Sequence, residues 1–115
     1  MNFGIDYHGT YSRDPEGFAA LVKLLQSRGH KCFLVTGIAD ENDFYSKEVR
    51  VAIGDTMPII FTAGAWKRRF VEALEIRIDV WIEDTPEGID VLSEGARASR
   101  DQWTSKALEA MRKST

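Results

Sequence analysis

The sequence has one cysteine and three prolines, and it contains no long apolar run. Cys32 has no partner for a disulfide within the chain, so the fold is not expected to depend on one. No apolar stretch approaches the roughly 20 residues that a membrane-spanning helix needs. The first residues also lack the basic segment and apolar stretch of a secretory signal. We therefore expect a cytoplasmic protein without a membrane partner.

Neither sign of charge dominates the chain. It carries 15 Lys and Arg against 18 Asp and Glu, a net charge of −3. The basic residues are spread along the sequence, so there is no strong nucleic-acid signature, although a local basic patch is compatible with this balance. A length of 115 residues with 43% hydrophobic content suffices for one compact domain with a core. We expect a single domain over residues 1–115.

The first third of the chain predicts a strand, a helix and a second strand. The apolar run over residues 2–6 ends in Asp6 and a Gly-Thr turn, which favours a buried strand that delivers an acid to a loop. Asp14 and Pro15 indicate a helix start, and Gly29 its end. A second apolar run over residues 32–35 ends in Thr36. The two strands of such a crossover unit should be parallel and end at the same edge of the sheet.

The remaining elements predict a three-layer α/β/α, Rossmann-like domain with a mainly parallel sheet. Further strands are expected at residues 49–53, 58–62 and 78–82, and helices at 65–74, 86–92 and 101–111. The connection over residues 40–47 is expected to be irregular or a short helix. Trp66, Trp81 and Trp103 lie on apolar stripes or runs, so we expect them in the core.

Polar side chains recur where the predicted strands end. Asp6 follows the first strand, Thr36 the second, and Glu83 with Asp84 the last, while Lys67 opens the helix before the last strand. Ligands of open parallel sheets bind beyond the carboxyl ends of the strands, so these groups are expected to meet in one crevice. A carboxylate attacks a phosphoryl group only when a divalent cation and a positive side chain relieve the repulsion between the anions.

The pattern resembles the haloacid dehalogenase superfamily of aspartate-dependent phosphohydrolases. Residues 3–10 are similar to its nucleophile motif, residues 34–37 to the second motif, Lys67 to the third and residues 81–86 to the acidic fourth. The resemblance covers about the first ninety residues. It implies a magnesium-dependent phosphatase that acts through an aspartyl-phosphate on a phosphorylated substrate.

The resemblance also implies a role for each residue. Asp6 would be the nucleophile and a magnesium ligand, Asp84 the second carboxylate on the metal, and the backbone carbonyl of His8 a third ligand. Thr36 would hydrogen-bond a phosphate oxygen. Lys67 would neutralise both the phosphate and Asp6.

Two neighbouring residues complete these expectations. Glu83 is expected to support the metal site without binding the metal directly. Arg68 is the alternative to Lys67 as the phosphate-binding cation, because both lie in one Lys-Arg-Arg run.

One position departs from the superfamily's pattern. Its phosphatases usually carry a second Asp two residues after the nucleophile, which protonates the leaving group and then activates water. This chain has His8 there. An imidazole is a competent general acid and base near neutral pH, so we expect His8 to take this catalytic role in a slow phosphatase.

The spacing leaves no room for a cap domain. The gap over residues 11–13 is short, and residues 37–66 are largely used by predicted elements. An uncapped site would admit a nucleotide, a nucleic-acid end or a phosphoprotein, unless a partner in a homo-oligomer covers it.

Two other functions stay open from the sequence. A non-enzymatic protein could keep the fold and bind phosphate or a partner, since His8 replaces the usual acid. A receiver-type phosphoacceptor domain has a similar length, and residues 55–58 superficially resemble its acceptor loop. Against it, that family has adjacent acids after the first strand, where this chain has only Asp6.

Overall fold

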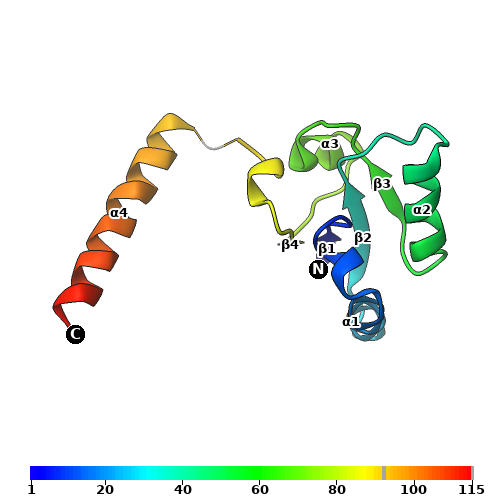
Figure 1. Cartoon of the computed structure of the whole chain (residues 1–115), viewed down its shortest axis with the longest axis horizontal. Helices are drawn as coiled ribbons and strands as arrows, with labels where there is room; N and C mark the ends of the chain where they lie inside the picture. The colour runs from blue at the N-terminus through cyan, green and yellow to red at the C-terminus, as the bar shows by residue number, and fades with distance from the viewer. Residues whose placement is uncertain (92, 115) are drawn as a thin grey trace.

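The computed structural model describes residues 1–91 and 93–114. Figure 1 shows a sheet surrounded by short helices, with a long C-terminal helix set apart from them. In chain order the elements are β1 (Asn2–Ile5), the 3-10 turn η1 (Tyr11–Arg13), α1 (Pro15–Ser27), β2 (Lys31–Thr36), α2 (Phe44–Ile53), β3 (Ile59–Phe61), α3 (Lys67–Ala73), β4 (Val80–Ile82), the 3-10 turn η2 (Pro86–Gly88) and α4 (Glu94–Lys113).

The strands form one sheet in the order β3-β2-β1-β4. All three strand pairs are parallel, with Phe3 opposite Cys32 and Val80, and Val35 opposite Ile60. The expected crossover unit and the parallel sheet are therefore confirmed within the described residues. The chain has an α/β architecture that is compatible with a Rossmann-like fold.

Helices pack on both faces of the sheet. Ile5 and Leu34 belong to one buried cluster with Val22 of α1 and Val49 of α2. The neighbouring strand residues Val35 and Ile60 point the other way and join Val71 of α3 in a second cluster. Because successive side chains of a strand alternate between faces, α1 and α2 lie on one side of the sheet and α3 on the other.

The start and end of α1 agree with the sequence. The Asp14 side chain accepts a hydrogen bond from the Gly17 amide at 3.0 Å, and Pro15 is the first helical residue. Gly29 follows the helix with a φ of +86°, a conformation in the left-handed region that favours glycine.

The predicted strand at residues 49–53 is wrong, because this stretch is the second half of α2. Asp43 and Ser46 form a reciprocal capping box that starts the helix at Phe44, before this stretch. Val49 and Ile53 are buried while Val51 is exposed. Val49 and Ile53 are four residues apart and so share one face of a helix, although every second residue of this stretch is also apolar.

The predictions for the C-terminal third were wrong in part. The helix expected at residues 86–92 is the short turn η2, and its expected end at Leu92 lies outside the described residues. The last helix is longer than expected and has no buried residue. Trp103 on it is 69% exposed, and Trp66 is 41% exposed. Neither belongs to the core, whereas Trp81 packs against the second cluster.

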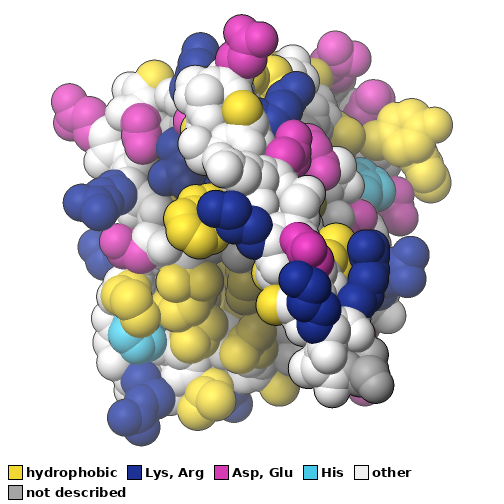
Figure 2. Space-filling view, turned by 90° about the vertical axis from the view of Figure 1, so that its left-hand side faces the viewer, with side chains coloured by type: hydrophobic (Ala, Val, Ile, Leu, Met, Phe, Trp, Pro, Cys, Tyr) yellow, Lys and Arg dark blue, Asp and Glu magenta, His cyan; other side chains and the backbone are white. Residues whose placement is uncertain are grey.

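The side of the molecule that carries α4 exposes apolar side chains. Figure 2 shows them gathered on the lower part of this face, beside the charged side chains of the neighbouring surface. None of the described helices is both long and apolar enough to span a bilayer.

Candidate functional site

The site lies where β1 and β4 end side by side. The ladder continues one residue past β1, because the Asp6 amide donates to the Ile82 carbonyl at 3.0 Å. After β1 the chain leads to α1 on one face. After β4 it leads to η2, and the Ile89 carbonyl behind η2 accepts from the Arg68 amide of α3 on the opposite face. This is the topological switch point at which open parallel sheets bind ligands.

Asp6 and Lys67 form a buried ion pair. The Lys67 Nζ donates to Asp6 Oδ1 at 2.8 Å, and the two side chains are each 8% exposed. Lys67 also pairs with Glu83, whose side chain is 5% exposed. Charges this deeply buried need such partners, because unpaired they would be strongly destabilising. Lys67 therefore holds two carboxylates that follow neighbouring strands.

The loop after β1 brings Asp84 into the same group. The Thr10 hydroxyl lies 3.3 Å from Asp6 Oδ2 and 3.4 Å from Asp84 Oδ1, so it can donate to either carboxylate. Gly9 has a φ of +82°, and a Cβ on it would lie 2.3 Å from Asp84 Oδ2. Only glycine combines this backbone conformation with the close approach of Asp84.

Thr36 and His8 face the same hollow. It has a volume of about 300 Å³, and the residues along it also include Asp6, Lys67 and Asp84. Thr36 is buried, and its hydroxyl makes no hydrogen bond within the described part of the chain. His8 is exposed and contacts the Tyr7 ring edge-on at 4.9 Å between ring centroids. The hydroxyl and the imidazole are thus both available to a ligand.

The three carboxyls differ in acidity. Burial raises the pKa of Asp6; Lys67 acts against this, and the nearby Asp84 adds to it. Burial also raises the pKa of Glu83, again against the effect of Lys67. A hydrogen bond with the Asp6 side chain lowers the pKa of the exposed Asp84. A proton taken up by the Asp6–Asp84 pair is therefore held mainly by Asp6.

These residues fit a magnesium ion. Asp6, Glu83 and Asp84 each offer a carboxylate oxygen, and the three oxygens lie within 4.8 Å of one another. Magnesium takes oxygen ligands, keeps several waters and needs only one or two carboxylates. Since Lys67 holds Glu83 and Asp6 Oδ1, the oxygens left for a metal are Asp6 Oδ2 and those of Asp84. The His8 carbonyl accepts no hydrogen bond from a described residue and is the third candidate.

Magnesium is expected to raise the melting temperature of the protein, and more so at neutral than at acidic pH. A metal ion competes with protons for carboxylates. Because the pKa of Asp6 lies above its ordinary value of 3.8, acidification through that raised pKa removes the ligand. Magnesium at about 100 times its dissociation constant would stabilise the fold by about 2.7 kcal/mol at neutral pH. Differential scanning fluorimetry with and without magnesium over a pH series measures this shift.

The matched control for this measurement is Asp84→Asn. It keeps the size of an exposed side chain and removes one expected ligand charge, so the magnesium shift should disappear while the metal-free protein stays folded. An equal shift in wild type and Asp84→Asn, or one independent of pH, would contradict a metal at this position.

The structure brings Asp6, His8, Thr36, Lys67 and Asp84 to one hollow, as the strand ends predicted. Of the two candidate cations, Lys67 reaches Asp6, whereas Arg68 lies 3.9 Å from Asp90, on the far side of η2.

Sequence reasoning gave no role to Thr10, which it took as part of a turn. Its position four residues after Asp6 was the available signal, but only the folded loop shows that its hydroxyl reaches two carboxylates. Tyr7 and Tyr11, in the segment that follows β1, are buried in the first core cluster.

The site thus combines a buried carboxylate, a buried ammonium group, an exposed second carboxylate and a free hydroxyl. This set is suited to binding a divalent cation together with a phosphate group. Comparison of the chain with protein-family models, with curated proteins and with solved structures finds no match.

Proposed function

We propose that this chain is a magnesium-dependent phosphohydrolase with a haloacid dehalogenase-like fold, acting through an aspartyl-phosphate on Asp6. The observation that carries the proposal is the convergence of Asp6, Thr36, Lys67 and Asp84 at the switch point of a parallel sheet. Each of these residues follows a strand or opens a helix in the order that the superfamily's four motifs require.

In the proposed first step, an Asp6 carboxylate oxygen forms a bond to phosphorus while the bond from phosphorus to the leaving oxygen breaks. Lys67 and the Thr36 hydroxyl bind the phosphate oxygens and orient the group. A bound magnesium ion would supply positive charge against which the two anions can approach. Asp6 and Asp84 would hold it, with Thr10 bridging their carboxylates.

His8 would move the protons. As an imidazolium it gives a proton to the leaving oxygen in the first step, and as a neutral imidazole it then takes one from the attacking water. That water displaces Asp6 from phosphorus and releases inorganic phosphate. The exposure of His8 at the mouth of the hollow supports this role, because both the leaving group and water have access there.

The short connections around the site support an uncapped enzyme. The loop after β1 leads through η1 directly into α1, and the chain between β2 and β3 contains α2 and turns. The exposed Asp84 and His8 leave the entrance open. Such a site suits a phosphate at the end of a large substrate.

A protein that binds phosphate without hydrolysing it is the second candidate. Its support is His8 at the position of the usual acid, together with a Lys67 that is already engaged by two carboxylates. In such a protein the same pocket would bind a phosphate group and release it unchanged.

A receiver-type domain finds less support. Asp55 precedes β3, so it lies at the amino end of the strands, whereas Asp6 and Thr36 lie at the carboxyl ends. An acceptor at Asp55 would be at the opposite edge of the sheet from Lys67.

Hydrolysis of a generic aryl phosphate tests the proposal. The wild-type protein should release phosphate with magnesium and lose this activity when the metal is chelated. His8→Asn should lower kcat by about 10²-fold, because it removes a general acid and base, and should change the pH profile. Absence of activity from acidic to alkaline pH would contradict the enzyme and, if inorganic phosphate still bound, favour the binding protein.

A further inference from the structure

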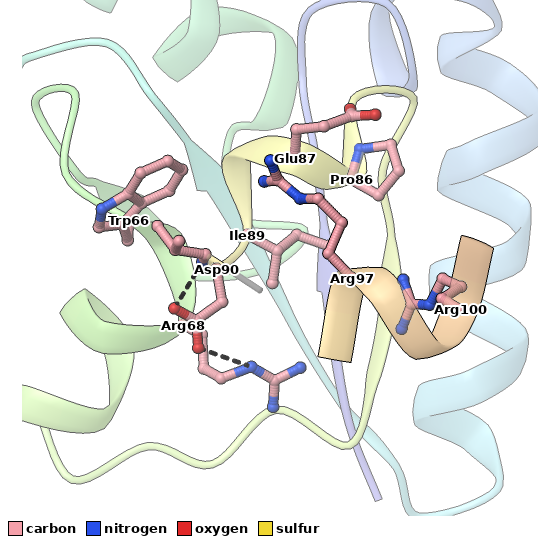
Figure 3. Close-up of a pocket in the computed structure, with 9 residues that line it drawn as sticks. Trp66, Arg68, Pro86, Glu87, Ile89, Asp90, Arg97 and Arg100 are labelled. Atoms are coloured by element: carbon pink, nitrogen blue, oxygen red, sulfur yellow. Dashed lines mark hydrogen bonds and ion pairs between the residues drawn. The ribbon is translucent and has the colours of Figure 1, made fainter. Parts of the chain in front are cut away.

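A second hollow of about 380 Å³ lies on the other side of η2. Figure 3 shows side chains from three parts of the chain around it: the start of α3, η2 with the residues that follow, and the first turns of α4. Its lining includes Trp66, Arg68, Glu87, Arg97 and Arg100. This volume is in the range of small-molecule sites.

Two of its cations have no counter-ion among residues 1–91 and 93–114. Asp90 neutralises the start of α3, since its carboxylate lies 3.9 Å from the Arg68 Nε and 3.3 Å from the Arg69 Nε. No carboxylate of the described residues lies within 4.0 Å of the Arg97 or Arg100 guanidinium. Three residues apart on α4, these two side chains are neighbours on one face of the helix.

Trp66 supplies an aromatic surface to the same hollow, at the start of α3. It is 41% exposed and immediately precedes Lys67, whose ammonium group holds Asp6 in the catalytic hollow. The two hollows are neighbours: Pro86 and Glu87 line this one, while Thr85 and Gly88 line the catalytic one. A ligand whose terminal phosphate reaches Asp6 can therefore continue across η2 toward the arginines.

We infer that this hollow binds the body of a single-stranded nucleic acid whose terminal phosphate is the substrate. The inference rests on the proposed function for the identity of the reacting group. The exposed Arg97 and Arg100 can bind anions other than the reacting phosphate, and a strand carries one on every nucleotide. Guanidinium groups bind phosphate in bidentate geometry, and tryptophan stacks on bases of any sequence.

The local charge agrees with this assignment although the whole chain is acidic. The first turns of α4 supply the cations Arg97 and Arg100, while the acidic residues along the hollow are Glu87 and Asp90, of which Asp90 is paired with the start of α3. The carboxylates of the catalytic cluster are paired with Lys67 or placed to hold a metal. A phosphopeptide would present one phosphate to the catalytic hollow and none to Arg97 and Arg100, so it fits the observed pair of cations less well.

Binding of a fluorescent oligodeoxythymidylate of about ten nucleotides, with a terminal phosphate, tests the site without turnover. Anisotropy is measured on the full chain in the absence of magnesium over a salt series. Arg97→Ala with Arg100→Ala should weaken binding at least tenfold. It should also reduce the slope of log K against log salt by about 1.4, as expected for two lost contacts to a single strand.

The matched control is Lys106→Ala with Lys113→Ala, which removes two cations from the same helix outside the hollow. It should leave the affinity within about twofold of wild type. Trp66→Ala should weaken binding about tenfold, and Trp66→Tyr should retain most of it, because an aromatic face remains.

Hydrolysis of the aryl phosphate separates this inference from the proposed function. The arginine double variant should hydrolyse the small substrate as wild type does, and lose activity on the oligonucleotide through a higher KM. An active phosphatase that binds no strand overturns the inference alone. A strand that binds through Arg97 and Arg100 to an inactive protein supports the inference and contradicts the proposed function. A monophosphorylated peptide bound as tightly as the strand, with the same dependence on both arginines, overturns the assignment to nucleic acid.

Discussion

Asp6→Asn is expected to reduce kcat for an aryl phosphate by about 10⁴-fold, because an amide cannot act as the nucleophile. The substitution preserves the shape of the side chain, and its carbonyl oxygen can still accept from the Lys67 Nζ that lies 2.8 Å from Asp6 Oδ1. It also removes one charge from a buried group of carboxylates. The variant should therefore fold as well as wild type, so that the loss reports chemistry and not unfolding.

Asp55→Asn is the matched control for Asp6→Asn. Asp55 is an exposed aspartate before β3, and a receiver domain would use it as the acceptor. Acid quenching during turnover, followed by intact-mass and peptide analysis, should place one phosphoryl group on Asp6 in wild type and in Asp55→Asn. Phosphorylation that persists in Asp6→Asn and disappears in Asp55→Asn would establish the receiver alternative.

Lys67→Met should lower the free energy of unfolding by about 3 kcal/mol at neutral pH, because it leaves two buried carboxylates without their cation. Asp6 and Glu83 both pair with this ammonium group, and all three side chains are at most 8% exposed. For a chain of this length the loss corresponds to a fall of about 10 °C in melting temperature. Urea unfolding followed by circular dichroism measures it.

The effect of Lys67→Met should shrink as the pH falls. Burial already raises the pKa of both carboxyls above their ordinary values of 3.8 and 4.5, and Lys67 opposes that rise. Without Lys67 the folded pKa values rise further, so the folded variant takes up protons that the unfolded chain does not. In the variant, the stabilising contribution of these two carboxyl groups is present at pH values below their ordinary pKa values. It is lost as the pH increases through their raised pKa values in the folded state. The difference between variant and wild type is then largest at neutral pH.

Lys23→Met provides the control for a lost lysine. Lys23 is exposed on α1, so its substitution should change stability by less than about 0.5 kcal/mol at every pH. Adding Glu83→Gln to Lys67→Met should recover part of the loss, because one buried charge is removed. A loss that is the same at all pH values, or no recovery in the double variant, would show that Lys67 acts through packing and not through its charge.

The sequence by itself determined β1, α1 and β2, because these elements carry local signals. The apolar runs end at polar turns, Asp14 and Pro15 start the helix, and Gly29 follows its end. Parallel strands share one edge for their carboxyl ends, so the sequence also predicted that Asp6, Thr36 and Asp84 would be neighbours. Such inferences need only chain direction and connectivity.

Other features depended on contacts between distant segments. The apolar pattern at residues 49–53 fits a strand as well as a helix, and the capping box with the burial of Val49 and Ile53 decided for α2. The Lys-Arg-Arg run offered two candidate cations for the phosphate. Only the fold shows that Lys67 contacts Asp6, whereas Arg68 lines the hollow on the other side of η2. No local sequence signal predicts that α4 is exposed, because an amphipathic stripe does not specify whether anything packs against it. The hollow around Arg97 and Arg100 was therefore not predictable from the sequence.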